Sequence, residues 1–228
     1  MPKQDQTKII SGKDLGALAL EDFCQRCFWL ERHNGKAPGI FPGIFSTIDS
    51  LSKKSVKRSF LERGILPDWL KIENVKGIVD FKKISMPIKD YGDWILTGNP
   101  DDIFELKDGS FHIVDYKTAR FTETQDKLLP MYEIQLNAYA YALPYQGLEP
   151  ISKLTLIYCE PMAELDDDNS FRLTFMSHNK EINLKPETIS ELLKRARGIL
   201  DNKNPPSPNP NCKEICLWVD DLSKKLNL

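Results

Sequence analysis

The sequence lacks both a long apolar run and a strong net charge. Its 228 residues contain no stretch approaching the ~20 consecutive apolar residues that a membrane-spanning helix needs. The opening MPKQDQTKII also lacks the apolar core of a secretion signal. We therefore expect a cytoplasmic protein without a membrane partner. Because the net charge is only -2, any contact with nucleic acid must come from a local basic surface rather than from bulk charge.

Histidine and cysteine are also scarce, with three and five residues respectively. In a reducing compartment the cysteines are expected to be thiols or metal ligands rather than disulfides. Cys159 lies in an apolar strand-like run and is assigned to the core. The other four form two close pairs, Cys24, Cys27, Cys212 and Cys216. They supply the four thiols of a tetrahedral zinc site or an iron-sulfur cluster. The alternative is reduced thiols that pack near Trp29 and Trp218.

The composition is that of an ordinary globular protein, with 41% hydrophobic and 28% charged residues. The length is sufficient for one domain with a sizeable core. We expect a single domain over residues 1–203. The stretch NPPSPNPN then forms a stiff spacer that cannot be helical, so residues 204–228 are predicted to be an extended arm that carries the second cysteine pair.

The most informative stretch is residues 98–118, GNPDDIFELKDGSFHIVDYKT. Two strand-like runs flank Asp108-Gly109, which is a strong hairpin signal. A two-residue loop would place Asp102 opposite Asp115, whereas a three-residue loop beginning at Lys107 places Asp101 there. We favour the three-residue loop, because a type I turn completed by a left-handed glycine is usual for this hairpin.

Alternation along the second strand places Asp115 and Lys117 on one face, together with apolar side chains. Two acids and an ammonium group are expensive to bury without partners. A divalent cation supplies that partner, and oxygen ligands from Asp101 and Asp115 suit Mg²⁺ or Mn²⁺. The lysine could then orient a metal-bound water, which suggests phosphodiester hydrolysis. The competing interpretation is that Asp-x-Lys is an exposed ion pair on a solvated hairpin.

These residues resemble a known family. Pro100-Asp101 followed by Asp115-Tyr116-Lys117 matches the signature of the PD-(D/E)XK nuclease superfamily. The surrounding Gly98-x-x-Asp101 and Asp-Tyr-Lys-Thr resemble its RecB-type branch, which includes the CRISPR-associated adaptation exonucleases. Gln135-x-x-x-Tyr139 is similar to the helix that follows the catalytic lysine in that branch.

The resemblance implies an α/β restriction-endonuclease-like core, in which a mixed central sheet is flanked by helices. It implies that Asp101, Asp115 and the Tyr116 carbonyl bind the metal and that Lys117 assists the attacking water. Gln135 and Tyr139 are implied to support the site or to position DNA.

The sequence departs from that branch in two places. Iron-sulfur members typically join one early cysteine to three late ones, whereas this chain offers two and two. Many members also carry a metal-binding histidine in the second helix, but residues 46–63 contain none. Asp49 is the nearest replacement, although an acid there ordinarily stabilises the first turn of a helix. Basic residues of the same helix could follow a phosphate backbone or could be its solvated face, namely Lys53, Lys54, Lys57 and Arg58.

Periodicity gives the remaining elements. Helices are predicted at 11–32, 46–63, 130–143 and 187–200, and strands at 75–88, 94–97, 103–106, 111–114, 151–158 and 171–176. The strands of 75–88 and 94–97 are expected to continue into the hairpin as four consecutive strands of one sheet. The polar connection 121–129 could cover the site or simply join two elements. The acidic tip 166–168 suggests a second metal site only weakly, and a solvated loop is the favoured interpretation.

The leading hypothesis is a Mg²⁺- or Mn²⁺-dependent nuclease that acts on DNA. The resemblance implies a RecB-like exonuclease of repair, recombination or defence, with a helicase as a candidate partner. One alternative is a nuclease-fold module that binds DNA or a partner without hydrolysing DNA. Another is a scaffold held together by the four thiols.

Overall fold

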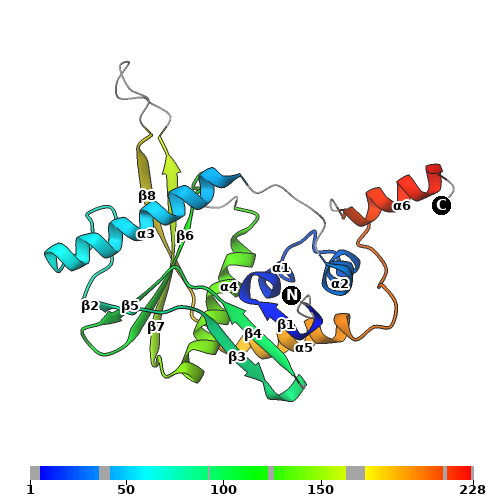
Figure 1. Ribbon diagram of the computed structural model, residues 1–228, viewed down its shortest axis with the longest axis horizontal. Coiled ribbons are helices and arrows are strands. Elements are labelled where there is room, and N and C mark those ends of the chain that lie inside the picture. Colours follow the sequence, from blue (N-terminus) through cyan, green and yellow to red (C-terminus); the bar gives the residue numbers. More distant parts are fainter. Residues whose placement is uncertain are drawn as a thin grey trace, which may run out of the picture.

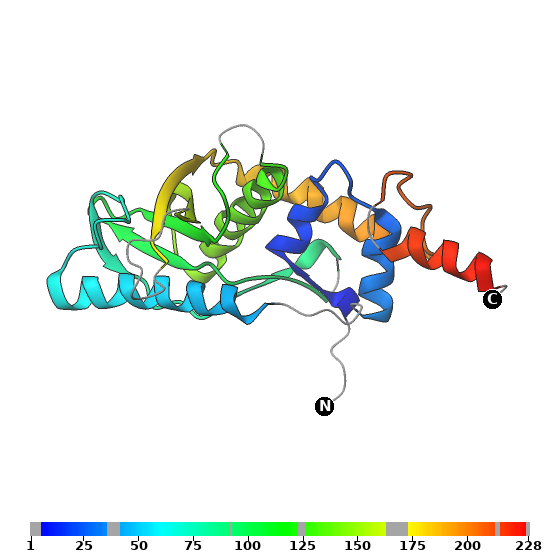
Figure 2. The same cartoon turned by 90° about the horizontal axis from the view of Figure 1, so that it is seen from above.

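The computed structural model describes residues 6–35, 42–91, 93–122, 126–162, 173–212 and 215–226. A twisted five-stranded sheet lies at its centre, between helices on both faces (Figures 1 and 2). Its strand order is β2-β5-β6-β7-β8. Only β6 and β7 are parallel, and the other neighbours are antiparallel. The strands are β2 (Val75–Ile78), β5 (Asp102–Leu106), β6 (Phe111–Lys117), β7 (Ile151–Pro161) and β8 (Phe175–Ile182).

The predicted hairpin is formed by β5 and β6. Ile103 pairs with Ile113. Gly109 has φ of +85°, and its N–H donates to the carbonyl of Leu106 at 3.0 Å. The Leu106 N–H in turn donates to the carbonyl of Ser110 at 2.8 Å. These bonds confirm the three-residue loop with a left-handed glycine.

Helices α3 (Gly43–Arg63) and α4 (Leu129–Ala142) cover opposite faces of the sheet (Figure 2). Alternation along β6 sends Ile113 toward the core that contains Leu136 of α4, and Val114 toward the core that contains Val56 of α3. Helix α3 ends at Gly64, which adopts the left-handed conformation typical of a helix end. The mixed sheet between helices confirms the expected α/β architecture.

A second, three-stranded sheet has the order β1-β4-β3. Its strands are β1 (Ile9–Ser11), β4 (Trp94–Gly98) and β3 (Ile84–Ile88). The prediction that four consecutive strands share one sheet is therefore wrong: β2 joins the large sheet, whereas β3 and β4 do not. The physical reason is that β4 pairs in parallel with β1, which lies more than 80 residues earlier in the chain.

The helix expected at 11–32 is also wrong as one element. The structure has α1 (Gly12–Ala17) and α2 (Gln25–Asn34), separated by turns. Helix α1 packs closely on α4, where a Cβ at Gly16 would lie 2.3 Å from the carbonyl oxygen of Met131. Helix α2 instead directs Cys24 and Cys27 toward the carboxy-terminal segment. One straight helix could not serve both contacts.

Helices α5 (Ile189–Leu200) and α6 (Ile215–Leu226) follow the sheet. The proline-rich stretch between them has no helix or strand among its described residues, and α6 lies beside α2 at one end of the molecule (Figures 1 and 2). Short 3₁₀ turns occupy Gln6–Lys8, Lys89–Tyr91, Leu143–Gln146 and Pro186–Thr188.

The acidic tip 166–168 and residues 123–125 of the polar connection lie outside the described residues. Within the described ranges, no helix combines the length and the apolar character needed to traverse a bilayer.

Candidate active site

Asp101 and Asp115 meet at the open end of the hairpin. Asp101 immediately precedes β5, and the register of Asp102 with Val114 places it opposite Asp115. One Asp101 oxygen, Oδ2, accepts a hydrogen bond from the Tyr116 N–H at 2.7 Å. Asp115 is only 2% exposed. The structure thus brings together the two carboxylates that the three-residue loop predicts.

Lys117 and Gln135 complete a polar network around Asp115. The Lys117 ammonium Nζ lies 2.5 Å from Asp115 Oδ2 and 3.5 Å from Gln135 Oε1. Gln135 Nε2 donates to Asp115 Oδ1 at 3.3 Å and to the Tyr139 hydroxyl at 2.7 Å. Helix α4 therefore positions the predicted Gln135 and Tyr139 against the predicted acid and lysine of β6.

Aromatic rings pack around this network. The Lys117 ammonium lies 4.5 Å from the centroid of the Tyr132 ring. Tyr139 is buried against Gly98, where an added Cβ would lie 2.4 Å from the ring carbon Cε1. The glycine of the Gly98-x-x-Asp101 motif thus permits close approach of the tyrosine ring to β4.

Burial and mutual repulsion make the acids of the site reluctant to ionise. The pKa of Asp115 rises to about 6, first because it is buried and second because Asp101 is nearby, although Lys117 opposes both effects. Burial also raises the pKa of Asp101, and the positive charge of Lys53 partly offsets that increase. Burial is therefore the main reason that the ionised forms of both acids are disfavoured.

Lys53 of α3 contacts the site, although its sequence pattern indicated only a phosphate contact or a solvated helix face. Its Nζ lies 2.6 Å from Asp101 Oδ1 and 2.8 Å from Asp49 Oδ2. The spacing of four residues predicts the pair with Asp49. The pair with Asp101 spans two elements that are distant in the chain, so no local signal could have indicated it. The three neighbours of Lys53 in that basic group are exposed, as a solvated face predicts: Lys54, Lys57 and Arg58.

Asp102 and Tyr116 form a second polar pair on the α3 face of the sheet. The Tyr116 hydroxyl donates to Asp102 Oδ2 at 2.7 Å, and both side chains are buried. Tyr116 therefore gives its N–H to Asp101 and its hydroxyl to Asp102. Its carbonyl as a metal ligand stays a prediction.

The acidic pair has the donor chemistry for a hard divalent cation. Asp115 Oδ2 is buried and, among the described residues, has no hydrogen bond beyond its ion pair with Lys117. Magnesium and manganese often take one or two carboxylates and retain several waters. Asp101 and Asp115 therefore fit such an ion. In the described ranges, no histidine or further acid joins them in a cluster of three or more ligand atoms.

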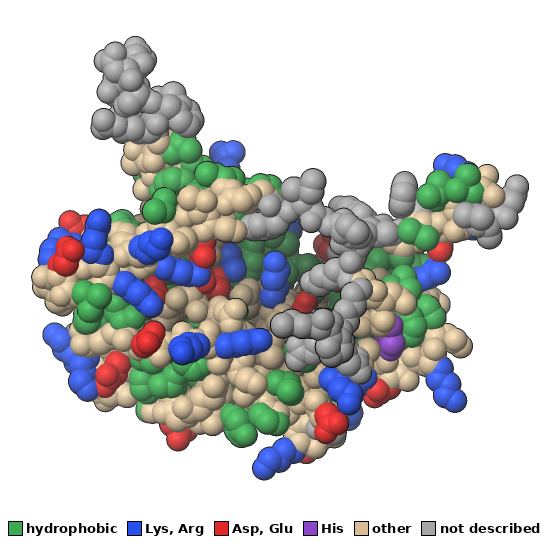
Figure 3. Space-filling model, viewed as in Figure 1, with side chains coloured by type: hydrophobic (Ala, Val, Ile, Leu, Met, Phe, Trp, Pro, Cys, Tyr) green, Lys and Arg blue, Asp and Glu red, His purple; other side chains and the backbone are tan. Residues whose placement is uncertain are grey.

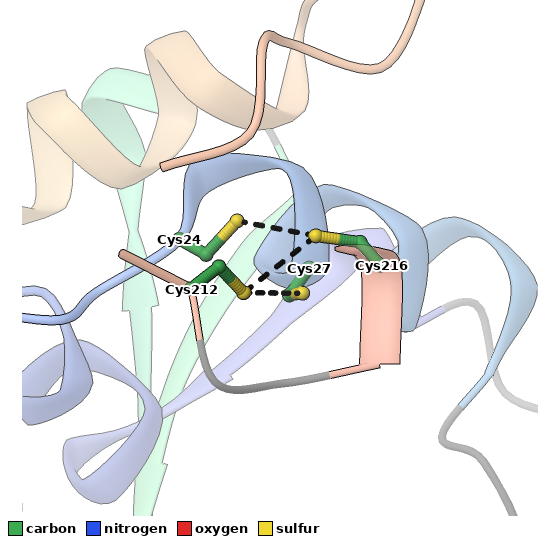
Figure 4. A group of neighbouring side chains, drawn as sticks. All are labelled: Cys24, Cys27, Cys212 and Cys216. Atoms are coloured by element: carbon green, nitrogen blue, oxygen red, sulfur yellow. Dashed lines mark hydrogen bonds between the residues drawn. The ribbon is translucent and has the colours of Figure 1, made fainter. Parts of the chain in front are cut away.

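The four paired cysteines form the one such cluster among the described residues. Their sulfurs all lie within 4.8 Å of one another, although the two pairs are more than 180 residues apart in the chain (Figure 4). Burial raises the pKa of Cys24, but hydrogen bonds from the backbone N–H groups of Cys27 and Asn209 and with the Cys216 and Cys212 thiols together lower that pKa to about 7. Trp29 donates its indole N–H to the Asn202 carbonyl, and the side chain of Trp218 is not among those described.

Cys159 is separate from this cluster. It is buried in the core between the sheet and α3, as its apolar surroundings in the sequence predict.

The surface over α3 carries lysine and arginine side chains with acids among them (Figure 3). This mixed pattern agrees with the net charge of -2. The view in Figure 3 therefore shows separate basic groups rather than one continuous basic face.

The mixed sheet, the helices on both its faces and the acid-lysine group at the end of its hairpin define a restriction-endonuclease-like α/β fold. The model of the PD-(D/E)XK nuclease superfamily matches residues 47–220, and the chain belongs to this superfamily. The resemblance noted in the sequence is thereby confirmed at the level of the superfamily.

Among solved structures, SSO0001 is similar with a TM-score of 0.46 and 14% identity, over 86% of this chain and 78% of that one. LHK-Exo, solved in complex with dAMP, is similar with a TM-score of 0.44 and 10% identity, over 97% of this chain and 95% of that one. No curated protein matches the sequence.

Proposed function

We propose that this protein is a metal-dependent nuclease that hydrolyses phosphodiester bonds in DNA. The observation that supports the proposal is the convergence of the buried Asp115, the partly buried Asp101 and Lys117 on one hairpin end, where Lys117 Nζ lies 2.5 Å from Asp115. Membership of the superfamily gives the general chemistry, phosphodiester hydrolysis. DNA as the substrate and Mg²⁺ or Mn²⁺ as the ion are parts of the proposal.

In the proposed mechanism, Asp101 and Asp115 hold the cation, which when bound would acidify a water and offset charge on the phosphate. Lys117 holds and orients the attacking water and stabilises charge that develops on a phosphoryl oxygen. Gln135 fixes the Asp115 carboxylate through its amide N–H, and Tyr139 accepts the second hydrogen bond of that amide. Gln135 and Tyr139 are thus positioning residues.

Lys53 has a separate part in the proposal. Its ammonium neutralises Asp101 from the α3 side, at 2.6 Å. A cation at Asp101 would weaken that ion pair by repulsion, and the lysine would become available to a DNA phosphate. Two lysines, Lys53 and Lys117, therefore approach the acidic pair from different elements.

The finer assignment is a RecB-like exonuclease of repair, recombination or defence that works with a helicase. Two motifs support it: Gly98-x-x-Asp101, whose glycine accommodates the Tyr139 ring, and Gln135-x-x-x-Tyr139, whose side chains are hydrogen bonded. We also propose that the four cysteines bind a metal.

A second candidate function is a DNA-binding module that has lost hydrolysis. It is favoured by the site's acidic pair, which has no third acid or histidine clustered with it in the part of the chain that the structure describes. Such a protein would bind DNA with a marked salt dependence and cut none.

The test uses purified protein with linear and circular DNA, single- and double-stranded, in Mn²⁺, in Mg²⁺ and in EDTA. We expect cleavage in the divalent ions and none in EDTA. Lys117→Ala should lower the rate about 10²–10⁴-fold while DNA binding persists. Lys153→Ala, at an exposed lysine of β7, is the control and should cut like the parent. Equal rates for Lys117→Ala and the parent would refute the nuclease assignment. Binding without cleavage in any divalent ion would establish the second candidate.

A further inference from the structure

The four clustered cysteines have sulfur positions that can be compared with known metal geometries. Three sulfur-sulfur distances are 3.6 Å: Cys24 to Cys216, Cys27 to Cys212, and Cys212 to Cys216. None of the four sulfurs lies more than 4.8 Å from another (Figure 4). The four sulfurs therefore form a small, compact group.

A single tetrahedral ion requires such spacing. With zinc-sulfur bonds of about 2.3 Å, the edges of the sulfur tetrahedron are about 3.8 Å long. An iron-sulfur cluster requires more room, because its thiolates bind different iron atoms. In a four-iron cluster a metal-metal edge separates each pair of sulfurs, which then lie on the order of 6 Å apart. The four cysteine sulfurs are therefore too close together to hold the iron-sulfur cluster that the resemblance to iron-sulfur nucleases implies.

The placement of the cysteines agrees with a small closed site. Cys24 and Cys27 lie at the amino-terminal end of α2, and Cys212 and Cys216 lie just before and within the first turn of α6. Thiolates are stabilised by the positive end of a helix dipole. The Asn209 N–H also points to Cys24 Sγ at 3.4 Å, as outer-shell donors to metal-bound thiolates do.

Burial and sequence spacing favour a structural ion over a reactive one. All four cysteines are at most 8% exposed, and Leu30 and Leu217 pack against them. Within each pair the cysteines are separated by two or three residues, Cys-x-x-Cys and Cys-x-x-x-Cys, which is the usual close spacing of structural zinc ligands. Four thiolates occupy all four coordination positions of a tetrahedral ion and leave none open for substrate or water.

We propose that Cys24, Cys27, Cys212 and Cys216 bind one zinc ion, which fastens the carboxy-terminal helix α6 to α2. The site joins two segments that are far apart in the chain, since its ligands come from positions 24–27 and 212–216. Arg26 reinforces the same junction through a bidentate ion pair with Asp220, at 2.6 and 3.1 Å. The inference depends on sulfur geometry and is independent of the proposed nuclease activity.

The first test is the metal content of the full chain, purified without oxygen from cells supplied with both iron and zinc. We expect one zinc per chain, no acid-labile sulfide and no visible absorbance. Exchange with Co²⁺ should give the intense visible bands of a tetrahedral thiolate site. Iron with sulfide and a brown colour would overturn the proposal, as would a single iron or a chain without metal.

The second test uses variants. Cys212→Ser and Cys216→Ser should each lose zinc, and Cys159→Ala, at the cysteine outside the cluster, should keep it. If the serine variants fail to fold, the parent itself remains testable, because a mercurial titration should release one zinc as four thiols react. After that release, limited proteolysis should cut residues 203–212 and detach α6. Zinc retained by the serine variants, or an unchanged cleavage pattern after release, would contradict the proposal.

Discussion

Asp102 should make the folded protein less stable as the pH rises. Its side chain is 4% exposed, on the α3 face of β5, and accepts one hydrogen bond from the Tyr116 hydroxyl. Burial raises its pKa to about 6; the Tyr116 bond opposes the rise, and the neighbouring Asp101 adds to it. Replacing Asp102 by asparagine retains the shape and the acceptor but removes the titration.

The direction in which stability changes with pH follows from proton binding. An unfolded aspartate titrates near 3.9, so between about pH 4 and 6 the folded state binds more protons than the unfolded state. Stability from Asp102 is therefore fully present below pH 4 and is lost as the pH rises through 6. A pKa of about 6 in the folded state, against the ordinary value of about 3.9, corresponds to roughly 3 kcal/mol. The asparagine NH₂ group needs its own partner, which reduces the gain by about 1 kcal/mol.

We expect Asp102→Asn to be more stable than the parent by about 1–2 kcal/mol at pH 8 and no more stable at pH 4. The assay is urea unfolding of both proteins at five pH values without added divalent ions. The dependence of the unfolding free energy on urea concentration should be the same for the two proteins, so that the free energies can be compared. Asp101 and Asp115 titrate in both proteins, so the difference reports the titration of Asp102 together with its coupling to Asp101. A difference in unfolding free energy that does not change with pH would refute the reasoning.

Two further substitutions test other parts of the site. Lys53→Met removes a positive charge from the acidic pair and should tighten Mn²⁺ binding about tenfold or more by calorimetry, whereas Lys54→Met, one position along, should not. Unchanged affinity in Lys53→Met would show that the lysine does not compete with the cation. Gly98→Ala forces a Cβ against the buried Tyr139 ring and should lower stability by about 1–3 kcal/mol in thermal unfolding. Gly77→Ala, whose Cβ would meet its nearest atom at 3.7 Å, is the control, and an equal loss in both would contradict the packing argument.

Local chemistry in the sequence determined the central features of the site. The Asp108-Gly109 turn sets the hairpin register, because glycine adopts the positive φ that the three-residue loop requires. That register alone places Asp101 opposite Asp115. A spacing of four residues likewise puts Gln135 and Tyr139 on one face of α4. Each of these relations depends on residues close together in the chain.

Tertiary structure decided the features that depend on distant partners. The division into two sheets follows from the pairing of β4 with β1, and the break between α1 and α2 follows from the different surfaces that each helix contacts. The pairing of Lys53 with Asp101 and the convergence of the four thiols are of the same kind. The sequence shows the four cysteines as two close pairs. Only folding sets the sulfur-sulfur distances that distinguish a site for one zinc ion from a site for an iron-sulfur cluster. Contacts between remote segments depend on how whole elements pack, and no local pattern of residues encodes that packing.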